Sequence, residues 1–272
     1  MATTLNDILS VTEQLWPRSG AESWDAVGLV SGDPAAPVTS ISLAVDAVLD
    51  TVDEAVSANA GLLLTHHPLL LRGVTAVAED RYKGAVLARL IRGNCALITA
   101  HTNADVVATG TSATLATRLG LVDVRPLVPG DAPDRGIGRV GRLAAPTTLG
   151  RLARQLADIL PATAGGIRAA GEYDAPVSTV ALCAGAGDAY LGLADVRGAD
   201  VYITSDLRHH PASEARENAR VAGGPALLDI SHWASEWLWL DTAAAQLRAA
   251  LPGVTVTLSE LRTDPWDFLV VQ

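Results

Sequence analysis

The sequence predicts an α/β fold made of two similar halves, each with a mixed, largely parallel sheet flanked by helices. Apolar strand-like runs alternate with helical segments, and the order strand, helix, strand, helix, strand occurs twice. All six histidines follow such runs, in four clusters: His66–His67, His101, His209–His210 and His232. Because α/β proteins bind ligands beyond the carboxyl ends of their strands, these clusters predict one metal cleft between the halves.

The first half is expected to span residues 1–129. Strands are predicted over residues 38–46, 61–65 and 95–100, and a helix over residues 47–59. The run over 61–65 ends in His66-His67-Pro68, where the proline blocks continuation of the strand. Neighbouring side chains on a strand point to opposite sides, but the twist at a strand end can bring both imidazoles into one site.

The second half is expected to span residues 130–272. It opens with a loop rich in Gly, Pro and Asp over 130–135. A strand over 137–144, a helix over 147–160 capped by Thr147 or Thr148, and a short strand over 166–170 should complete the second sheet. The repeated order then follows, with strands predicted over 179–184, 200–204 and 226–230 and a helix over 188–196.

Composition narrows the class of protein. The chain has 272 residues, 49% of them hydrophobic, which suffices for one large domain or two small ones. A net charge of −10 argues against a nucleic-acid partner, and no apolar run is long enough to span a membrane. The N-terminus does not have the pattern of a signal peptide, and two cysteines, Cys95 and Cys183, fit inert core packing in a reducing cytoplasm.

Two carboxylates follow histidines at the same spacing. Asp105 lies four residues after His101, and Glu236 lies four residues after His232. On a helical turn this spacing places both side chains on one face, where each pair could hold an ion. Mixed imidazole and carboxylate ligands suit zinc, iron, manganese or nickel better than calcium or magnesium.

The chain resembles the GTP cyclohydrolase I type 2 homologues, also called Nif-three-like dinuclear metal centre hexameric proteins. The resemblance covers nearly the whole chain and runs through the segments Trp-Asp-Ala-Val-Gly-Leu at 24–29, Thr-His-His-Pro at 65–68, Ala-His-Thr-Asn-Ala-Asp at 100–105, Ala-Gly-Ala-Gly at 184–187, Ile-Thr-Ser-Asp at 203–206 and Ser-His-Trp-Ala-Ser-Glu at 231–236. An ordered series of motifs is more specific than any one of them.

The resemblance implies a site as well as a fold. Its metal ligands would be His66, His67, Asp105, His232 and Glu236, holding two bridged divalent ions per chain in a cleft between the halves. It further implies a ring of six chains, attack on GTP or another nucleotide, and, in longer members, an inserted middle domain for which this chain has no room. Ala26, Ala184, Ala186, Ser205 and Ser231 stand where the family pattern differs, which puts an identical substrate in doubt.

Each residue also has a structural alternative. His66–His67 could simply end a strand, Asp105 could cap a helix, and His232 with Glu236 could form an ordinary pair on a helix face. His101 is expected either to be a metal ligand itself or to orient Asp105 through a hydrogen bond.

The remaining motifs are weaker. His209 and His210 could start a helix at the surface or take part in substrate contact and proton transfer, with Asp206 orienting them or capping the helix. The turn over 185–187 could approach a phosphate with its amides. The tryptophans are expected to pack in the core or at a subunit interface: Trp233, Trp237 and Trp239.

The leading functional hypothesis is a dinuclear-metal-dependent hydrolase in the cytoplasm, acting on a small molecule such as a nucleotide. Two divalent ions would lower the pKa of a water that attacks C8 of the guanine ring of GTP, with His210 or His101 moving protons. The same ligands would serve a phosphoesterase or nucleotidase. A non-catalytic metal-binding hexamer, acting as scaffold or regulator, is the alternative from another class.

Overall fold

The computed structural model describes residues 2–271 and divides them into two compact units. The first unit holds the chain up to Val107 together with Leu240–Thr263. The second holds Ala108–Trp239 and the chain from Asp264 onward. This division differs from the expected boundary at residues 129 and 130, because the chain enters the second sheet earlier and returns to the first sheet near its end.

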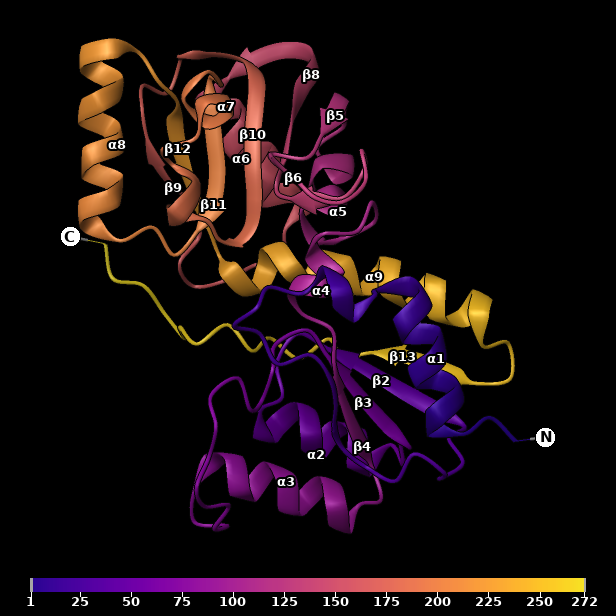
Figure 1. Cartoon of the computed structure of the whole chain (residues 1–272). Helices are drawn as coiled ribbons and strands as arrows, with labels where there is room; N and C mark the ends of the chain where they lie inside the picture. The colour runs from indigo at the N-terminus through magenta and orange to yellow at the C-terminus, as the bar shows by residue number, and fades with distance from the viewer. Residues whose placement is uncertain (1, 272) are drawn as a thin grey trace. The chain divides into compact units, whose positions relative to one another are not determined.

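The first unit is built on a five-stranded sheet in the order β1-β4-β3-β2-β13 (Figure 1). The strands are β1 (Gly28–Ser31), β2 (Ser40–Ala44), β3 (Leu62–Thr65), β4 (Ala96–Thr99) and β13 (Thr255–Leu258). All neighbours pair in parallel except β1, which runs antiparallel to β4. The ends of β2, β3 and β4 therefore lie along one edge of the sheet.

Helices of the first unit cover this sheet. They are α1 (Leu5–Leu15), η1 (Arg18–Gly20), α2 (Leu49–Ser57), α3 (Tyr82–Arg92) and α4 (Thr102–Asp105). The core beneath α2 and α3 is aliphatic, with Val52 and Leu90 packed in one cluster with Leu63 and Leu97 of the central strands. These side chains are fully buried, so the central strands are held on a rigid base.

The second unit contains a six-stranded sheet in the order β5-β8-β10-β11-β12-β9. Its strands are β5 (Leu121–Arg125), β8 (Arg139–Thr148), β9 (Arg168–Ala170), β10 (Pro176–Ala186), β11 (Val201–Ser205) and β12 (Ala226–Ile230). The strands β10, β11 and β12 pair in parallel, while the other three pair antiparallel. The predicted α/β fold with mixed sheets is confirmed. The first sheet is largely parallel, as predicted, whereas three of the five pairings in the second sheet are antiparallel.

The remaining elements of this unit are α5 (Thr111–Arg118), α6 (Leu149–Ile159), η2 (Asp188–Tyr190), α7 (Ala194–Arg197), α8 (His209–Ala222) and the small sheet of β6 (Val128–Pro129) with β7 (Gly136–Ile137). Thr148 caps α6, one of the two predicted residues. The single helix expected over 188–196 is wrong: it is split into η2 and α7, with Gly192, a poor helix former, in the interruption. Finally, α9 (His232–Ala250) contributes residues to both units.

Both cysteines are buried in apolar clusters, as predicted, with Cys95 in the core of the first unit and Cys183 in that of the second. Trp233 and Trp239 are also buried. Among the described residues, no helix is long and apolar enough to cross a membrane.

Candidate metal centre

Three histidines of the first unit meet at the carboxyl ends of its parallel strands. His66 and His67 directly follow β3, and His101 follows β4 at the start of α4. Their ring centroids lie 5.1 to 5.6 Å apart. One nitrogen from each ring lies within 4.8 Å of the others, close enough to share an ion. The end of β3 thus brings both of its adjacent imidazoles to one site, as the strand-end argument predicted.

The other nitrogen of each ring is held by a fixed acceptor. His66 Nδ1 lies 2.9 Å from the carbonyl oxygen of Ala100. His67 Nδ1 lies 2.7 Å from Asp46 Oδ1. Because a carbonyl or carboxylate oxygen only accepts, each Nδ1 donates, and the lone pair that can ligate a metal is then on Nε2.

His101 is held in the same way, by the carboxylate of Asp25 at 2.9 Å from Nδ1. The side chain of Asp25 is fully buried and also accepts hydrogen bonds from the backbone N–H and the hydroxyl of Thr102. Burial would raise its pKa, but the hydrogen bonds from His101 and Thr102 and the charge of His101 together hold the pKa of Asp25 well below its usual range. Asp25 is therefore an anion that orients His101, which belongs to the group that can share an ion.

Asp105 adds a carboxylate to this group. It ends the single turn of α4, and its Oδ1 lies 3.7 Å from Nε2 of the fully buried His66. Two hydrogen bonds hold the turn: the Asn103 carboxamide accepts from the N–H of His101 and donates to the carbonyl of Trp16. The spacing between His101 and Asp105 therefore brings both residues to the same strand edge.

The second unit carries its own pair at the start of α9. His232 Nε2 lies 3.0 Å from Glu236 Oε1, across one helical turn, and the Glu236 carboxylate is buried. His232 Nδ1 lies 2.8 Å from Asp206 Oδ2. Burial alone would lower the pKa of His232, but the charge of Glu236 and the hydrogen bonds to Asp206 and Glu236 raise it well above its usual value.

Asp206 occupies an unusual backbone position. It follows β11 with a φ of 58°, the left-handed region that few non-glycine residues adopt. This conformation turns the carboxylate towards His232 at the end of the neighbouring strand β12. Asp206 thus orients His232, whereas the sequence had offered it either for orienting His209–His210 or for capping the helix that follows.

Gly185 lies against the same pair at the end of β10, with a φ of +72°. A Cβ at this position would lie 2.5 Å from Glu236 Oε1 and 3.4 Å from His232 Nε2. Its N–H donates to the hydroxyl of Ser235. The amide that might have contacted a phosphate is therefore bound within the protein, and the glycine makes room for the Glu236 carboxylate.

The donor sets fit the metals expected from the sequence. Within the two units, four histidines have Nδ1 held by an oxygen acceptor. Carboxylates lie near Nε2 of two of them, Asp105 at 3.7 Å from His66 and Glu236 at 3.0 Å from His232. This is the arrangement by which proteins orient histidine ligands to zinc and similar ions. All five predicted ligands lie in these two groups, and His101 lies in the first.

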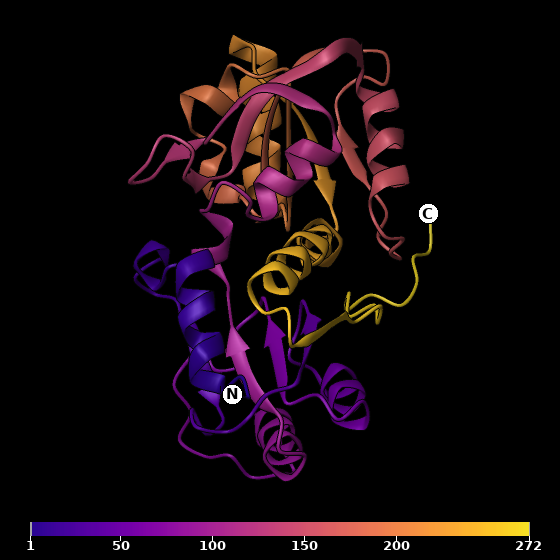
Figure 2. The ribbon, with the colours of Figure 1, turned by 90° about the vertical axis from the view of Figure 1, so that its right-hand side faces the viewer.

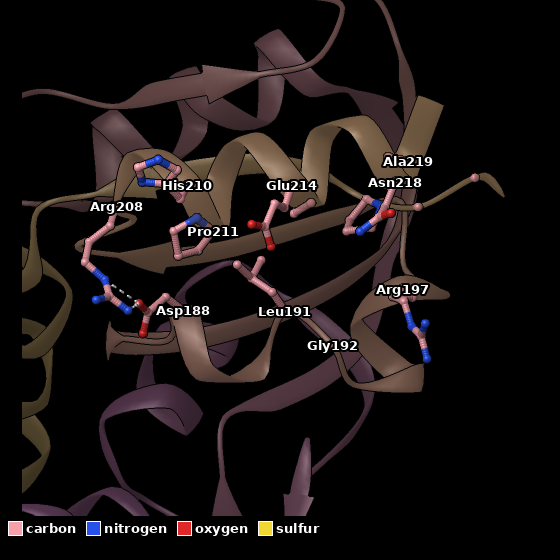
Figure 3. Close-up of a pocket in the computed structure, with 14 residues that line it drawn as sticks. Asp188, Leu191, Gly192, Arg197, Arg208, His210, Pro211, Glu214, Asn218 and Ala219 are labelled. Carbon is pink, nitrogen blue, oxygen red and sulfur yellow. Dashed lines mark hydrogen bonds and ion pairs between the residues drawn. The ribbon is translucent and has the colours of Figure 1, made fainter. Parts of the chain in front are cut away.

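His209 and His210 lie elsewhere in the second unit, in the first turn of α8, with ring centroids 5.2 Å apart. His210 lines a cavity of about 540 Å³ together with Glu214. In Figure 3 it lies above the ion pair of Arg208 with Asp188. The lining of this cavity does not include His232 or Glu236. The role of His210 in proton transfer therefore stays a prediction.

Sequence reasoning did not assign the three orienting carboxylates to their histidines. Asp25 and Asp206 lie inside motifs that the sequence singled out, and Asp46 is the last residue of the strand predicted over 38–46. The available signal was their position, since an acidic residue that ends a strand lies at the same sheet edge as the histidines.

The fold and the histidine–carboxylate group of each unit define a class of protein: an α/β protein with imidazole and carboxylate side chains at the ends of parallel strands. The sequence profile of Duf34/NIF3 (NGG1p interacting factor 3) matches residues 3–265. The chain belongs to the Duf34/NIF3 family, which confirms the predicted resemblance.

Named relatives agree with this assignment. A Streptomyces coelicolor protein called GTP cyclohydrolase 1 type 2 homolog is 48% identical over 270 residues, covering 96% of this chain and 93% of the relative. A Mycobacterium tuberculosis protein of the same name is 35% identical, covering 98% and 97%. That alignment spans 378 positions, more than the 272 residues here, so the mycobacterial protein carries sequence that this chain lacks. A solved structure of a hypothetical protein from Staphylococcus aureus superposes with a TM-score of 0.89 at 26% identity, over 99% of this chain and 100% of that one.

Proposed function

We propose that the chain is a metal-dependent hydrolase that binds two divalent ions, of zinc, iron, manganese or nickel, and acts on a nucleotide. Its ligands are His66, His67, Asp105, His232 and Glu236. The names of the relatives make GTP the first candidate substrate. A phosphoester of a nucleotide is the second, because the same donor set serves both reactions.

One observation carries this proposal: each ligand histidine has its Nδ1 tied to a carboxylate or carbonyl oxygen. Histidines with a purely structural role would not all need to be held by the same ring nitrogen. Holding Nδ1 selects the tautomer that presents Nε2 to a metal and makes that nitrogen more basic. When bound, divalent ions supply a water of lowered pKa and positive charge for the developing anion.

The side chains have separable roles in this proposal. Asp46 and Asp206 fix the rings of His67 and His232 so that little reorganisation is needed on binding. His101, held by Asp25, is a candidate for proton transfer beside the ligands, which is the role the sequence predicted for it. His210 is retained as a second candidate, to be tested by substitution.

Metal content tests the proposal without an activity assay. Elemental analysis should find about two ions per chain in the wild type and clearly fewer after His67→Ala or Glu236→Ala. His209→Ala is the matched control, since it removes an exposed imidazole outside both groups and should leave the metal content unchanged. Full metal content in both ligand variants would refute the assignment.

Activity separates an enzyme from a non-catalytic metal-binding scaffold. Protein loaded with each metal would be assayed against GTP, other nucleotides and phosphoesters. Turnover that falls on His101→Ala or His210→Ala while metal is retained supports the hydrolase and identifies the proton-transfer residue. No turnover of any substrate, with two ions bound, would favour the scaffold.

The proposal includes a cytoplasmic protein that assembles as a homohexamer and binds neither nucleic acid nor membrane. Light scattering tests the assembly, and a stable monomer would remove it. Salt-dependent binding to DNA or RNA would contradict the expectation drawn from the net charge of −10.

A further inference from the structure

The second unit contains an apolar cavity that the metal chemistry does not use. It has a volume of about 550 Å³ and lies along α6 and the segment over 160–173, with lining residues that include Ala153, Ala157, Leu160, Ile167, Tyr173 and Ser231. Arg154 is its charged lining residue in the described chain, and it donates a hydrogen bond to the Tyr173 hydroxyl at 2.9 Å. A cavity of this size and lining accepts large apolar side chains.

The end of the chain starts at the rim of this cavity. The hydroxyl of Ser231, a lining residue, donates to Asp264 Oδ2 at 2.6 Å. The segment that follows, which we call the C-terminal arm (residues 264–271), has no regular secondary structure and runs as an extended trace (Figure 2). The arm therefore begins at a fixed point beside the cavity.

The arm exposes an apolar set of side chains. Exposure is 68% for Trp266, 81% for Phe268, 64% for Leu269, 70% for Val270 and 86% for Val271. Isolated apolar residues are common at surfaces, but contiguous apolar patches mark interaction sites. A single chain leaves these side chains in water next to an apolar cavity, so an additional surface is needed to cover them.

We infer that the C-terminal arm of one copy of this chain binds in the α6 cavity of a second copy. The chain bends at Pro265, where the N–H of Trp266 donates to Asp264 Oδ1 at 3.1 Å, so the start of the arm is fixed. The exposed side chains beyond this bend show that the arm does not fill the cavity of its own chain. The charges match as well, because the arm carries Asp267 and the cavity carries Arg154. Exchange of identical arms between two copies gives a closed, symmetric contact.

Sedimentation equilibrium over a range of concentrations tests this contact. In Trp266→Ala/Phe268→Ala the dissociation constant for self-association should rise about 100-fold, because aromatic anchors in apolar pockets dominate binding. Val221→Ala is the matched control, since Val221 is 87% exposed at the end of α8 and lies outside both surfaces. Wild-type association of the double variant, or a wild type that is monomeric, would overturn the inference.

Charge reversal and mixing give a second test. Arg154→Asp and Asp267→Arg should each weaken association by at least tenfold, and the two changes together should restore most of it. Ala157→Arg fills the cavity and should behave like the arm variant. An equimolar mixture of the cavity variant and the arm variant should regain association, because one intact arm then meets one intact cavity. No restoration in either experiment would overturn docking between copies.

Failure of the arm contact can be distinguished from failure of the proposed metal binding, because the two are measured separately. Arm and cavity variants should keep the metal content of the wild type, measured by elemental analysis, while their association changes. Loss of metal in the Ala157→Arg variant, with an unchanged association constant, would count against the inference.

Discussion

Replacing Gly185 with alanine tests the geometry of the candidate metal ligands His232 and Glu236 with a single added carbon. The new Cβ would lie 2.5 Å from Glu236 Oε1, so the carboxylate must retreat by roughly 1 Å to reach ordinary van der Waals separation. Glu236 is buried and therefore cannot move freely into solvent. The positive φ of Gly185 adds a backbone cost of about 1 kcal/mol for any residue with a Cβ.

These two effects separate experimentally. The backbone cost lowers the free energy of unfolding, whereas the displaced carboxylate lowers metal affinity by about 10- to 100-fold, the range seen when the orientation of ligands is disturbed. That loss corresponds to roughly 1.4 to 2.8 kcal/mol of binding free energy. Metal affinity would be measured by competition with a chromogenic chelator, and stability by chemical unfolding of the metal-free protein.

Gly120→Ala is the matched control. Gly120 has a φ of +69°, yet a Cβ there meets nothing within 4 Å. It should lose a similar amount of stability and keep the metal affinity of the wild type. If Gly185→Ala binds metal like the wild type, or if both variants lose affinity equally, the close approach of Gly185 to Glu236 has no part in metal binding.

Three further predictions follow from the orienting groups and the buried thiol. Asp206→Asn keeps a residue that tolerates the left-handed region but removes a charge, so the pKa of His232 in the metal-free protein should fall, as NMR titration would show; an unchanged pKa would contradict the account. The pKa of Asp25 is lowered on folding, so Asp25 stabilises the fold at pH values above its unfolded pKa and loses this effect as the pH falls. In acid unfolding, the free energy of unfolding of Asp25→Asn should therefore depend less on pH than that of the wild type. An equal dependence in both proteins would contradict the role of Asp25 as a buried anion. Burial raises the pKa of Cys95 from 9.0 to about 11, so the unfolded state binds fewer protons between these values and the free energy of unfolding should fall by roughly 2 kcal/mol from pH 9 to pH 11. Cys95→Ala should lack this contribution, and an equal fall in both proteins would refute it.

The groups of ligand-type residues could be predicted because their signals are local. His66 and His67 follow an apolar run and precede a proline, and Glu236 lies one helical turn after His232. Strand ends and helical spacing are both properties of a few consecutive residues. The sequence therefore indicates which side chains share a strand edge.

The orienting carboxylates could not be predicted in the same way, because each acts across the fold. Asp46, Asp25 and Asp206 lie 21, 76 and 26 residues from the histidines that they hold. Their contacts depend on which strands are neighbours and in what register, which no local pattern encodes. The same reason applies to β13, a four-residue strand that pairs with β2 from the other end of the chain.

The histidines differ in the kind of oxygen that holds Nδ1, and this difference bears on how pH affects the site. His66 is held by a carbonyl, whereas His67 and His232 are held by carboxylates. Burial alone would lower the pKa of His232, but Glu236 and Asp206 raise it well above its usual value. In the metal-free protein, a proton therefore competes with the proposed ion for the imidazole of His232. We therefore expect the affinity of His232 and Glu236 for the proposed ion to fall as the pH falls.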